Sequence, residues 1–330
     1  VVPALGGSPR QITTGAFNHT SDISWSSDQT TLYFSANRHD VHKSEHRNSE
    51  IYAVNLTDGY IRALTYRFGP DNNPKISPDG KLIAYTGSDD KRMGYHNNSL
   101  YVMNIDGSNV RNMTQSLDRS VGTFHWSGKA VYFQYTDLGS NKVSRVSMAG
   151  DIYEISSGVS GTSFGRPYAG GTFNVSADGT IAMTYATAMD QANIGVADRR
   201  SGDVTQITDI NAELLDHRKL GTVEEVWYKS SHDGQDIQGW LVKPTDFDAS
   251  KKYPLILEIH GGPFSAYGPH FSAEIQLMAN NGYMVLYTNP RGSTGYGYDF
   301  ANLIHLNYPG NDYDDLISGV DHVIGLGNVD

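Results

Sequence analysis

A four-strand pattern that returns about every fifty residues is the feature that most constrains the fold of this chain. Each copy opens on a serine that follows an apolar or aromatic residue. These serines are Ser26, Ser77, Ser127 and Ser176, spaced 51, 50 and 49 residues apart. Three of the copies place an aspartate two residues later, and all four then enter a short apolar run. Short strands at this spacing, without a helical period, are typical of β-propeller blades.

Each copy ends with a second pair of strands around a glycine turn, at Gly59, Gly107, Gly150 and Gly202. Glycine readily takes the positive φ that tight hairpins need. A β-sandwich built from similar hairpins is the alternative, and four copies in register argue against it. The sequence therefore predicts four blades over residues 15–213. Residues 1–14 resemble the end of the fourth copy, so we expect the last strand of a preceding blade there, and further blades before Val1.

A different pattern begins after the fourth copy. We expect a linker and a first hairpin over residues 214–250. Strands at residues 255–260 and 283–288 then alternate with helices that begin near Pro269 and at Asn311. The second helix has Asp312, Asp314 and Asp315 in its first turn and Leu316, Val320, Val323 and Ile324 along one face. This alternation predicts a parallel sheet, so residues 251–330 correspond to part of an α/β-hydrolase domain that ends before its nucleophile strand.

Two glycines directly after the first buried strand of this region carry the clearest chemical signal. In α/β-hydrolases the loop at this point supplies a backbone N–H to the oxyanion hole. Glycine suits that role because no Cβ keeps a carbonyl oxygen away from the amide. We therefore predict Gly262, together with Gly261, as oxyanion donors. The alternative for His260-Gly261-Gly262-Pro263 is a plain turn that ends a strand.

Two further motifs match catalytic patterns in an unsuitable context. Gly161-Thr162-Ser163-Phe164-Gly165 has the Gly-x-Ser-x-Gly spacing of a nucleophile turn, but it lies between two blades, without a buried strand before it or a helix after it. His42-Lys43-Ser44-Glu45-His46 has the spacing of some zinc peptidases, but it is a polar insertion without an apolar helical face. We expect both segments to be blade loops, and we expect neither a metal nor another cofactor.

Unusually long strand connections in the first two blades carry charged side chains. Arg38, Glu45 and Arg47 belong to one connection, and Arg92, with Asp89 and Asp90, to the corresponding one a blade later. If these loops face the hydrolase domain, their charges are candidates for binding the charged terminus or side chains of a peptide. Ordinary surface charge is the alternative.

The composition limits the partners. The chain has 25 Lys and Arg against 36 Asp and Glu, a net charge of −11, and no basic block, which argues against a nucleic-acid partner. The absence of cysteine excludes disulfides and a cysteine nucleophile. No apolar run approaches the ~18 residues of a membrane span. The chain starts at Val1 without a leader, so we expect any targeting signal to have been removed or to lie upstream.

A propeller followed by such a hydrolase segment resembles the prolyl oligopeptidase family of serine peptidases. The resemblance is carried by Glu258-Ile259-His260-Gly261-Gly262-Pro263 and by Asn289-Pro290-Arg291-Gly292-Ser293-Thr294-Gly295-Tyr296-Gly297. Prolyl oligopeptidase itself has a tyrosine where His260 stands, so the chain is more similar to the acylaminoacyl-peptidase and bacterial dipeptidyl-peptidase branch. The resemblance implies hydrolysis of short peptides through an acyl-enzyme, with the propeller restricting entry. It also implies positions near the cleft for Arg291 and Tyr267, either as substrate-binding residues or as braces of the loop.

The Ser-Asp-His triad of that family has no counterpart in this sequence, and its nucleophile is expected within about fifteen residues after Asp330. We therefore expect the chain to be the middle of a larger enzyme, continued at both ends, and inactive alone. An esterase or amide hydrolase on the same scaffold remains an alternative, as does a propeller that serves only as a binding module. The resemblance is compatible with a homo-oligomer and slightly favours a periplasmic or secreted location over a cytoplasmic one.

Overall fold

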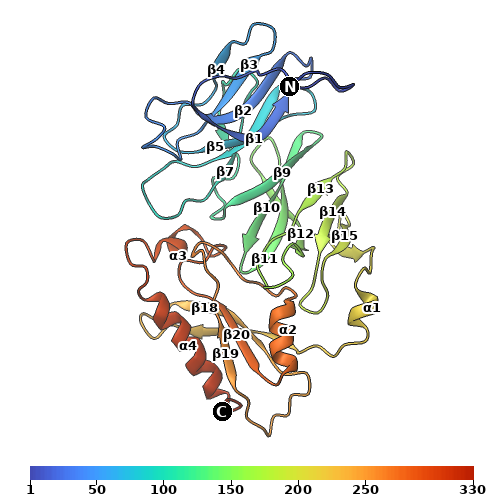
Figure 1. The fold of residues 1–330 in the computed structure, drawn as a ribbon, viewed down its shortest axis with the longest axis vertical. Helices are drawn as coiled ribbons and strands as arrows, with labels where there is room; N and C mark the ends of the chain where they lie inside the picture. Colours follow the sequence, from blue (N-terminus) through green and yellow to red (C-terminus); the bar gives the residue numbers. More distant parts are fainter.

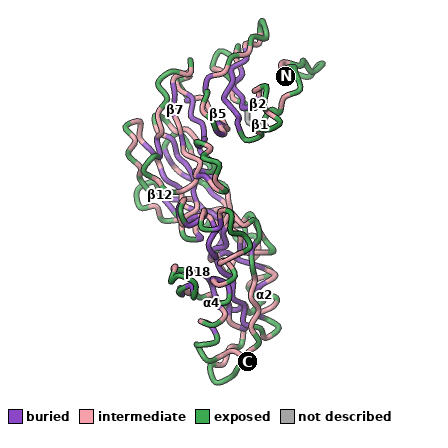
Figure 2. The backbone as a smooth tube through the Cα atoms, turned by 90° about the vertical axis from the view of Figure 1, so that its left-hand side faces the viewer, coloured by how far each residue is buried: buried purple, intermediate pink, exposed green. Residues whose placement is uncertain are grey.

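The computed structural model describes residues 1–330, apart from the side chains of residues 20–22. The molecule is elongated, with the N-terminal sheets at one end and a sheet flanked by helices at the other (Figure 1). Buried residues run through the sheets in both parts, while exposed residues concentrate in the connecting loops (Figure 2). In the part of the chain that the structure describes, no helix is both long and apolar enough to cross a membrane.

Sixteen strands form the N-terminal part, four for each copy of the sequence repeat. Blade 1 contains β1 (Asn18–Trp25), β2 (Thr31–Asn37), β3 (Glu50–Asn55) and β4 (Ile61–Ala63). Blade 2 contains β5 (Asp71–Ile76), β6 (Leu82–Gly87), β7 (Ser99–Asn104) and β8 (Arg111–Asn112). Blade 3 contains β9 (Val121–Ser127), β10 (Ala130–Asp137), β11 (Ser140–Val146) and β12 (Ile152–Val159). Blade 4 contains β13 (Phe173–Val175), β14 (Ile181–Tyr185), β15 (Asn193–Ala197) and β16 (Val204–Gln206).

The repeated serine and aspartate build the turn between the first two strands of blades 1, 2 and 4. The Ser26 hydroxyl donates to Asp28 at 2.6 Å and accepts the backbone N–H of Thr31 at 2.9 Å. Ser77 and Asp79 repeat the hydroxyl-to-carboxylate bond at 2.7 Å in the second blade. These local bonds fix the turn that joins the first two strands of a blade. The repeat can be recognised in the sequence because the bonded residues are close in the chain.

The hydrophobic core of the propeller lies between neighbouring blades. Ile51 of blade 1 packs with Ile83 and Met103 of blade 2, and all three side chains are fully buried. Phe124 and Phe133 of blade 3 share a second cluster with residues of blade 2. A single residue pair, Val159 with Tyr185, also joins the sheets of blades 3 and 4. The four predicted blades are thus present and stack side by side, which confirms a partial propeller.

Residues 1–17, expected to include the last strand of a preceding blade, contain no strand. Ile12 from this segment packs against the core cluster of blade 1, beside Leu32 and Val54. The backbone N–H of Arg10 donates to Val1 O at 2.8 Å, so the segment folds back on itself.

The C-terminal part is a four-stranded sheet in the order β17-β18-β20-β19. Its elements are α1 (Ala212–Leu215) in the connection from blade 4, β17 (Val223–Lys229), β18 (Asp236–Val242), β19 (Leu255–Glu258), α2 (Ala273–Asn280), β20 (Met284–Asn289), α3 (Tyr298–Asn302) and α4 (Asp312–Gly325). The hairpin β17–β18 is antiparallel, whereas β19 and β20 run parallel. Val329 adds a parallel bridge to Tyr253, directly before β19. This is the predicted hydrolase-type succession of strands and helices.

Helices α2 and α4 cover opposite faces of this sheet. Ile275 of α2 shares a core cluster with Val285 and Tyr287, while Val323 of α4 packs with Met284 and Leu286. Because successive side chains of a strand point to opposite faces, this alternation along β20 puts one helix on each side. Figure 1 shows the same arrangement.

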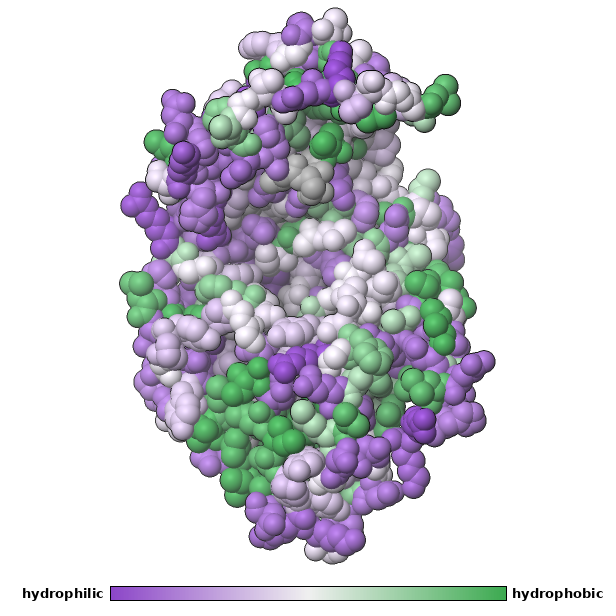
Figure 3. Space-filling view, viewed as in Figure 1, coloured by the Kyte–Doolittle hydropathy of each residue, from purple (hydrophilic) through white to green (hydrophobic). Residues whose placement is uncertain are grey.

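Two details of the helices differ from the expectation. Helix α2 begins at Ala273 with Ser272 as its N-cap, four residues later than Pro269. Helix α4 starts at Asp312 as predicted, but its buried side contains Asp315, Leu316, Ser318, Gly319 and Val323. Ile324, predicted on the apolar face, is 50% exposed. Apolar side chains therefore also gather on the outer surface over α4, where Ile317 and Leu326 are exposed as well (Figure 3).

Candidate active site

The turn after β19 leaves backbone N–H groups free at the end of a parallel strand. The sequence predicts that this strand is buried, but all four β19 residues are only partly buried, because β19 lies at the edge of the four-stranded sheet. Gly261 and Gly262 are both exposed, and no described residue accepts a hydrogen bond from either amide. Gly262 has φ of +129°, a conformation that L side chains rarely adopt. A Cβ built on Gly261 would meet nothing within 4 Å, so the space beside its amide is open. This geometry suits an amide that receives a ligand oxygen.

His260, the residue before the two glycines, is buried and belongs to the support of the turn. Its Nε2 lies 3.0 Å from the hydroxyl of Ser293, and that hydroxyl donates to Pro290 O at 2.7 Å. Burial lowers the pKa of His260, so the ring is neutral near pH 7. Ser293 is 1% exposed. The pair therefore joins the turn to the loop after β20, and its serine is inaccessible to a substrate.

Tyr267 lies beneath the turn and is completely buried. Its hydroxyl donates to Glu258 Oε1 at 3.0 Å. Its backbone N–H donates to the Asn289 side-chain oxygen at 2.8 Å, and its carbonyl accepts from the same amide group at 2.9 Å. Burial, followed by the nearby Glu258 carboxylate, raises the pKa of Tyr267, which keeps the phenol neutral. These contacts favour a bracing position over direct contact with a substrate.

Arg291 is also buried, with all of its side-chain nitrogens engaged. Nε donates to Asp315 at 2.9 Å, and Nη2 donates to the second oxygen of the same carboxylate at 2.8 Å. Asp233 accepts from Nη1 and Nη2 at 3.2 and 3.0 Å, and the Ser230 hydroxyl lies 3.2 Å from Nη2. The resemblance allows Arg291 either to bind substrate or to brace the loop, and these contacts favour the bracing role.

Three of the four charged propeller residues meet in one hollow of about 220 Å³. Glu45 and Arg47 from the β2–β3 loop face Arg92 and Asp90 from the β6–β7 loop there, with Phe68 and Asn48 at the side. Arg38 does not line this hollow. Its guanidinium reaches Thr14 O at 3.3 Å and His19 Nε2 at 3.0 Å instead.

The β6–β7 loop continues from this hollow to the hydrolase part. Gly94 N–H donates to His305 Nδ1 at 3.1 Å, and the Asn302 side chain bonds both backbone groups of Tyr95 at 3.1 Å. The Tyr95 ring lies 5.5 Å from that of Phe264, two residues after Gly262. The loop that lines one side of the charged hollow thus also reaches the segment directly after the glycine turn.

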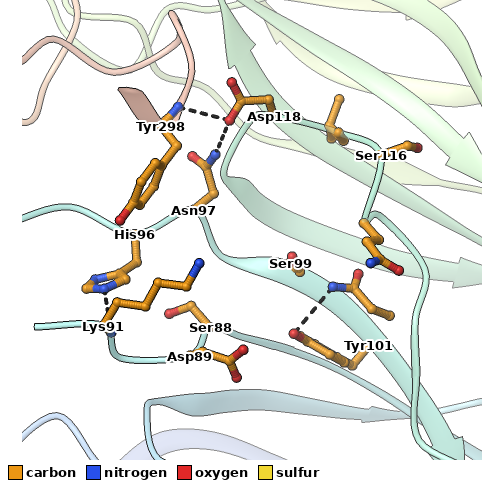
Figure 4. Close-up of a pocket in the computed structure, with 13 residues that line it drawn as sticks. Ser88, Asp89, Lys91, His96, Asn97, Ser99, Tyr101, Ser116, Asp118 and Tyr298 are labelled. Carbon is orange, nitrogen blue, oxygen red and sulfur yellow. Dashed lines mark hydrogen bonds between the residues drawn. The ribbon is translucent and has the colours of Figure 1, made fainter. Parts of the chain in front are cut away.

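A second, polar hollow of about 290 Å³ lies where this loop meets α3 (Figure 4). Lys91, Asp89 and Tyr298 line it, and Asp118 stands at its upper rim. One Asp118 oxygen accepts from Asn97 at 2.8 Å and from the Tyr298 N–H at 2.9 Å, so a propeller side chain caps a hydrolase helix. Gly297 has φ of +99°, a backbone conformation that side chains rarely adopt, and a Cβ there would force the Asp118 carboxylate to move.

Both motif matches lie in loops. Ser163 donates to Arg166 O at 2.7 Å within the β12–β13 connection, and His42 lies in the β2–β3 loop with Nδ1 at 2.9 Å from His39 O. Among the described residues, no three His, Asp or Glu side chains are arranged to hold a metal ion.

Two important residues escaped the sequence analysis. The sequence pattern places Asp315 only among the acids of the first helical turn, whereas the structure buries it on the same side of α4 as Leu316 and Gly319. His270 is buried between the domains, where its Nδ1 accepts from Ser160 at 2.7 Å and its Nε2 donates to Gly139 O at 3.1 Å. Burial lowers the pKa of His270 to about 4. No sequence signal marks that contact.

Comparison with known sequences agrees with the geometry. Residues 269–330 match the prolyl oligopeptidase family, and residues 1–93 match the dipeptidyl peptidase IV N-terminal region. Dipeptidyl-peptidase 5 of Porphyromonas gingivalis is 28% identical over 97% of this chain and 46% of the relative. A probable dipeptidyl-peptidase 5 of Aspergillus niger is 30% identical over 77% of this chain and 35% of its own length. The chain therefore spans about half the length, or less, of these curated relatives.

Solved structures agree as well. The acylaminoacyl peptidase of Pyrococcus horikoshii superposes with a TM-score of 0.75 at 25% identity, over 96% of this chain and 46% of the other. An acylaminoacyl peptidase in complex with Z-Gly-Gly-Phe-chloromethyl ketone gives a TM-score of 0.77 at 25% identity, with the same coverage. The blades and the hydrolase-type sheet thus occur together in these solved structures, and this chain belongs to the prolyl oligopeptidase family, with its relatives in the acylaminoacyl-peptidase and dipeptidyl-peptidase branch.

Proposed function

We propose that these residues form the propeller and the oxyanion side of a serine peptidase that acts on short peptides, of the acylaminoacyl- or dipeptidyl-peptidase type. The observation that carries the proposal is the exposed pair of amides at Gly261 and Gly262, which have no acceptor among the described residues and lie at the end of a parallel strand. The names of the relatives support the substrate class.

In acyl transfer, attack on a peptide carbonyl places negative charge on its oxygen. A backbone N–H held 2.7–3.1 Å from that oxygen stabilises the tetrahedral intermediate, and loss of one such donor costs about 10²–10³ in kcat. The Gly262 N–H, with Gly261 beside it, is positioned for this role. The second donor in α/β-hydrolases is the amide that follows the nucleophile. The Gly262 backbone needs no reorganisation, because His260 and Tyr267 are fixed on either side of it.

The charged hollow supplies the contacts for a short peptide. Arg47 and Arg92 offer guanidinium groups for a carbonyl or a carboxylate, and Glu45 and Asp90 offer carboxylates for an ammonium group. The Glu45 carboxylate accepts a hydrogen bond from the Asn48 side chain at 3.2 Å. The β6–β7 loop connects this hollow to the segment after the glycine turn, so a peptide held in the hollow by its charged end would be limited in length. The propeller then selects short substrates by geometry.

A serine-directed fluorophosphonate probe tests the proposal. Residues 1–330 alone should remain unlabelled, whereas a chain that joins them to a segment with a Ser-Asp-His triad should be labelled. That longer chain should cleave N-acylaminoacyl or dipeptidyl p-nitroanilides faster than p-nitrophenyl esters of similar size. Labelling with ester hydrolysis alone would favour an esterase, and absence of labelling in the longer chain would contradict the proposal.

A further inference from the structure

One propeller loop pairs with the hydrolase backbone shortly after the glycine turn. This loop, Gly161–Gly171 between β12 and β13, is called the docking loop below. Its shape is fixed within the propeller: the Ser163 hydroxyl donates to Arg166 O at 2.7 Å, and the buried Gln191 side chain donates to Ser163 O at 2.8 Å. It is therefore a preformed surface and not a free strand of chain.

The docking loop pairs with the hydrolase backbone a few residues after the glycines. The Ala169 N–H donates to Ala266 O at 2.9 Å, and the Gly268 N–H donates to Pro167 O at 2.9 Å. Between these bonds, Tyr168 and Tyr267 form an antiparallel bridge with their rings 4.8 Å apart. Since Tyr267 lies beneath the turn, this bridge transmits the position of the propeller to the glycines.

The docking loop also caps helix α2. Phe164 O accepts from the Ala273 N–H at 3.0 Å, and Gly165 O accepts from the Glu274 N–H at 3.3 Å. Gly165 O further accepts the Ser272 hydroxyl at 2.6 Å. The first N–H groups of a helix have no partner inside the helix, so these carbonyls determine where α2 begins. The segment that matches Gly-x-Ser-x-Gly therefore contacts the start of α2.

Arg166 joins the two elements on either side of the turn. One guanidinium nitrogen, Nη1, lies 2.5 Å from Glu258 Oε1, and Nε lies 3.2 Å from Glu274 Oε2. Glu258 is the last residue of β19, and Glu274 is in the first turn of α2. The two carboxylates thus bracket the turn, and a planar guanidinium can hold both at a fixed separation.

We propose that the docking loop sets the geometry of the glycine turn, with Arg166 as its positioning residue. Its importance for catalysis rests on the proposed function, because Gly261 and Gly262 are oxyanion donors only if the protein is a hydrolase. The coupling itself does not depend on turnover. A shift of the propeller relative to the sheet moves Glu258, Tyr267 and the start of α2 together, and with them the two amides.

The amide resonances of ¹⁵N-glycine-labelled residues 1–330 test this coupling directly. In Arg166→Ala, the resonances of Gly261, Gly262 and Gly268 should shift, while that of Gly282, beyond the far end of α2, stays in place. The Gly268 amide should also exchange with solvent about tenfold faster, since a local opening then costs less. Arg199→Ala is the matched control, because Arg199 bonds only Asp178 O within blade 4, at 3.1 Å, and it should change none of these signals.

A conservative series separates positioning from general stabilisation. Arg166→Lys keeps the charge without the fork and should give shifts between those of the wild type and Arg166→Ala. If Arg166→Ala fails to fold, Glu274→Gln, which removes only the more exposed partner, should move the same glycine resonances by a smaller amount. Unchanged Gly261 and Gly262 resonances in the folded Arg166 variants, even with a lower melting temperature, would overturn the proposal. Because the readout uses no substrate, this result is independent of whether the protein is a peptidase.

Discussion

Arg291 and Asp315 form a buried, two-bonded ion pair that ties the loop after β20 to helix α4. The Arg291 side chain is 3% exposed and that of Asp315 is 0% exposed, and the Arg291 backbone N–H donates to the same carboxylate at 2.8 Å. The loop that follows β20 also holds Ser293, the hydrogen-bond partner of His260. The ion pair therefore supports the glycine turn through the loop that follows β20.

Removing the Asp315 charge should destabilise the protein strongly. Asp315→Asn leaves a buried guanidinium without its main partner, and breaking a buried pair costs about 3–5 kcal/mol. Asp233→Asn is the matched control: Asp233 binds the same guanidinium but its side chain is 39% exposed, so the loss should stay near 1 kcal/mol or less. Urea unfolding followed by tryptophan fluorescence measures both. Equal losses of unfolding free energy in the two variants would contradict the argument that the burial of Asp315 makes its ion pair the more important one.

The buried Glu50 makes the propeller less stable as the pH rises. Burial raises the pKa of Glu50 from 4.5 to about 7, and its partners are the Thr65 hydroxyl at 2.5 Å and the His39 ring at 3.6 Å. The folded state then binds more protons than the unfolded state between these two values, so this contribution is complete below pH 4.5 and lost by about pH 7. At ~1.4 kcal/mol per pKa unit, the change is on the order of 3 kcal/mol.

Glu50→Gln should abolish that slope and raise the free energy of unfolding at pH 8. Glu154→Gln, at an exposed ion pair with Lys142, is the control and should leave the slope as it is. Unfolding free energies measured from pH 4 to pH 8 test whether Glu50 causes this pH dependence. A wild-type slope that persists in Glu50→Gln would assign the pH dependence to other groups.

The two glycines of the turn should respond differently to alanine. Gly262→Ala forces a Cβ onto a backbone with φ of +129°, a strain of about 1–3 kcal/mol. Gly261→Ala meets no atom within 4 Å, so its effect should stay within about 0.5 kcal/mol. Urea unfolding of the two variants in parallel gives the comparison, and equal destabilisation would contradict the geometry of the turn.

The blades were predictable because their information is local. The bond from Ser26 to Asp28 spans two residues, and it returns with the repeat. The glycine turn was predictable for the same reason, as it directly follows a strand with a continuous apolar run. The positions that sequence reasoning placed wrongly depend on distant partners. Helix α2 starts at Ala273, where Ser272 is its N-cap, and the Ser272 hydroxyl is in turn held by Gly165 O, 107 residues earlier in the chain. Asp315 is buried because Arg291 is there to pair with it.

The charged loops also combine a feature that local sequence predicts with contacts that depend on distant residues. Sequence reasoning grouped Arg38 with Glu45, Arg47 and Arg92, because all four lie in long connections of the first two blades. The structure unites the last three in one hollow, since the β2–β3 and β6–β7 loops are neighbours in space. Arg38 instead bonds Thr14 O, in a segment whose path the repeat does not encode.

The most direct test of the account is to delete the Gly262 N–H alone. Replacing Gly262 by glycolic acid exchanges that N–H for an ester oxygen and adds no side chain. In a chain that joins residues 1–330 to a triad-bearing segment, kcat for a dipeptidyl or N-acylaminoacyl p-nitroanilide should fall about 10²–10³-fold with little change in KM, because the lost donor acts on the transition state. An unchanged kcat would contradict the assignment of the glycine turn as the oxyanion site.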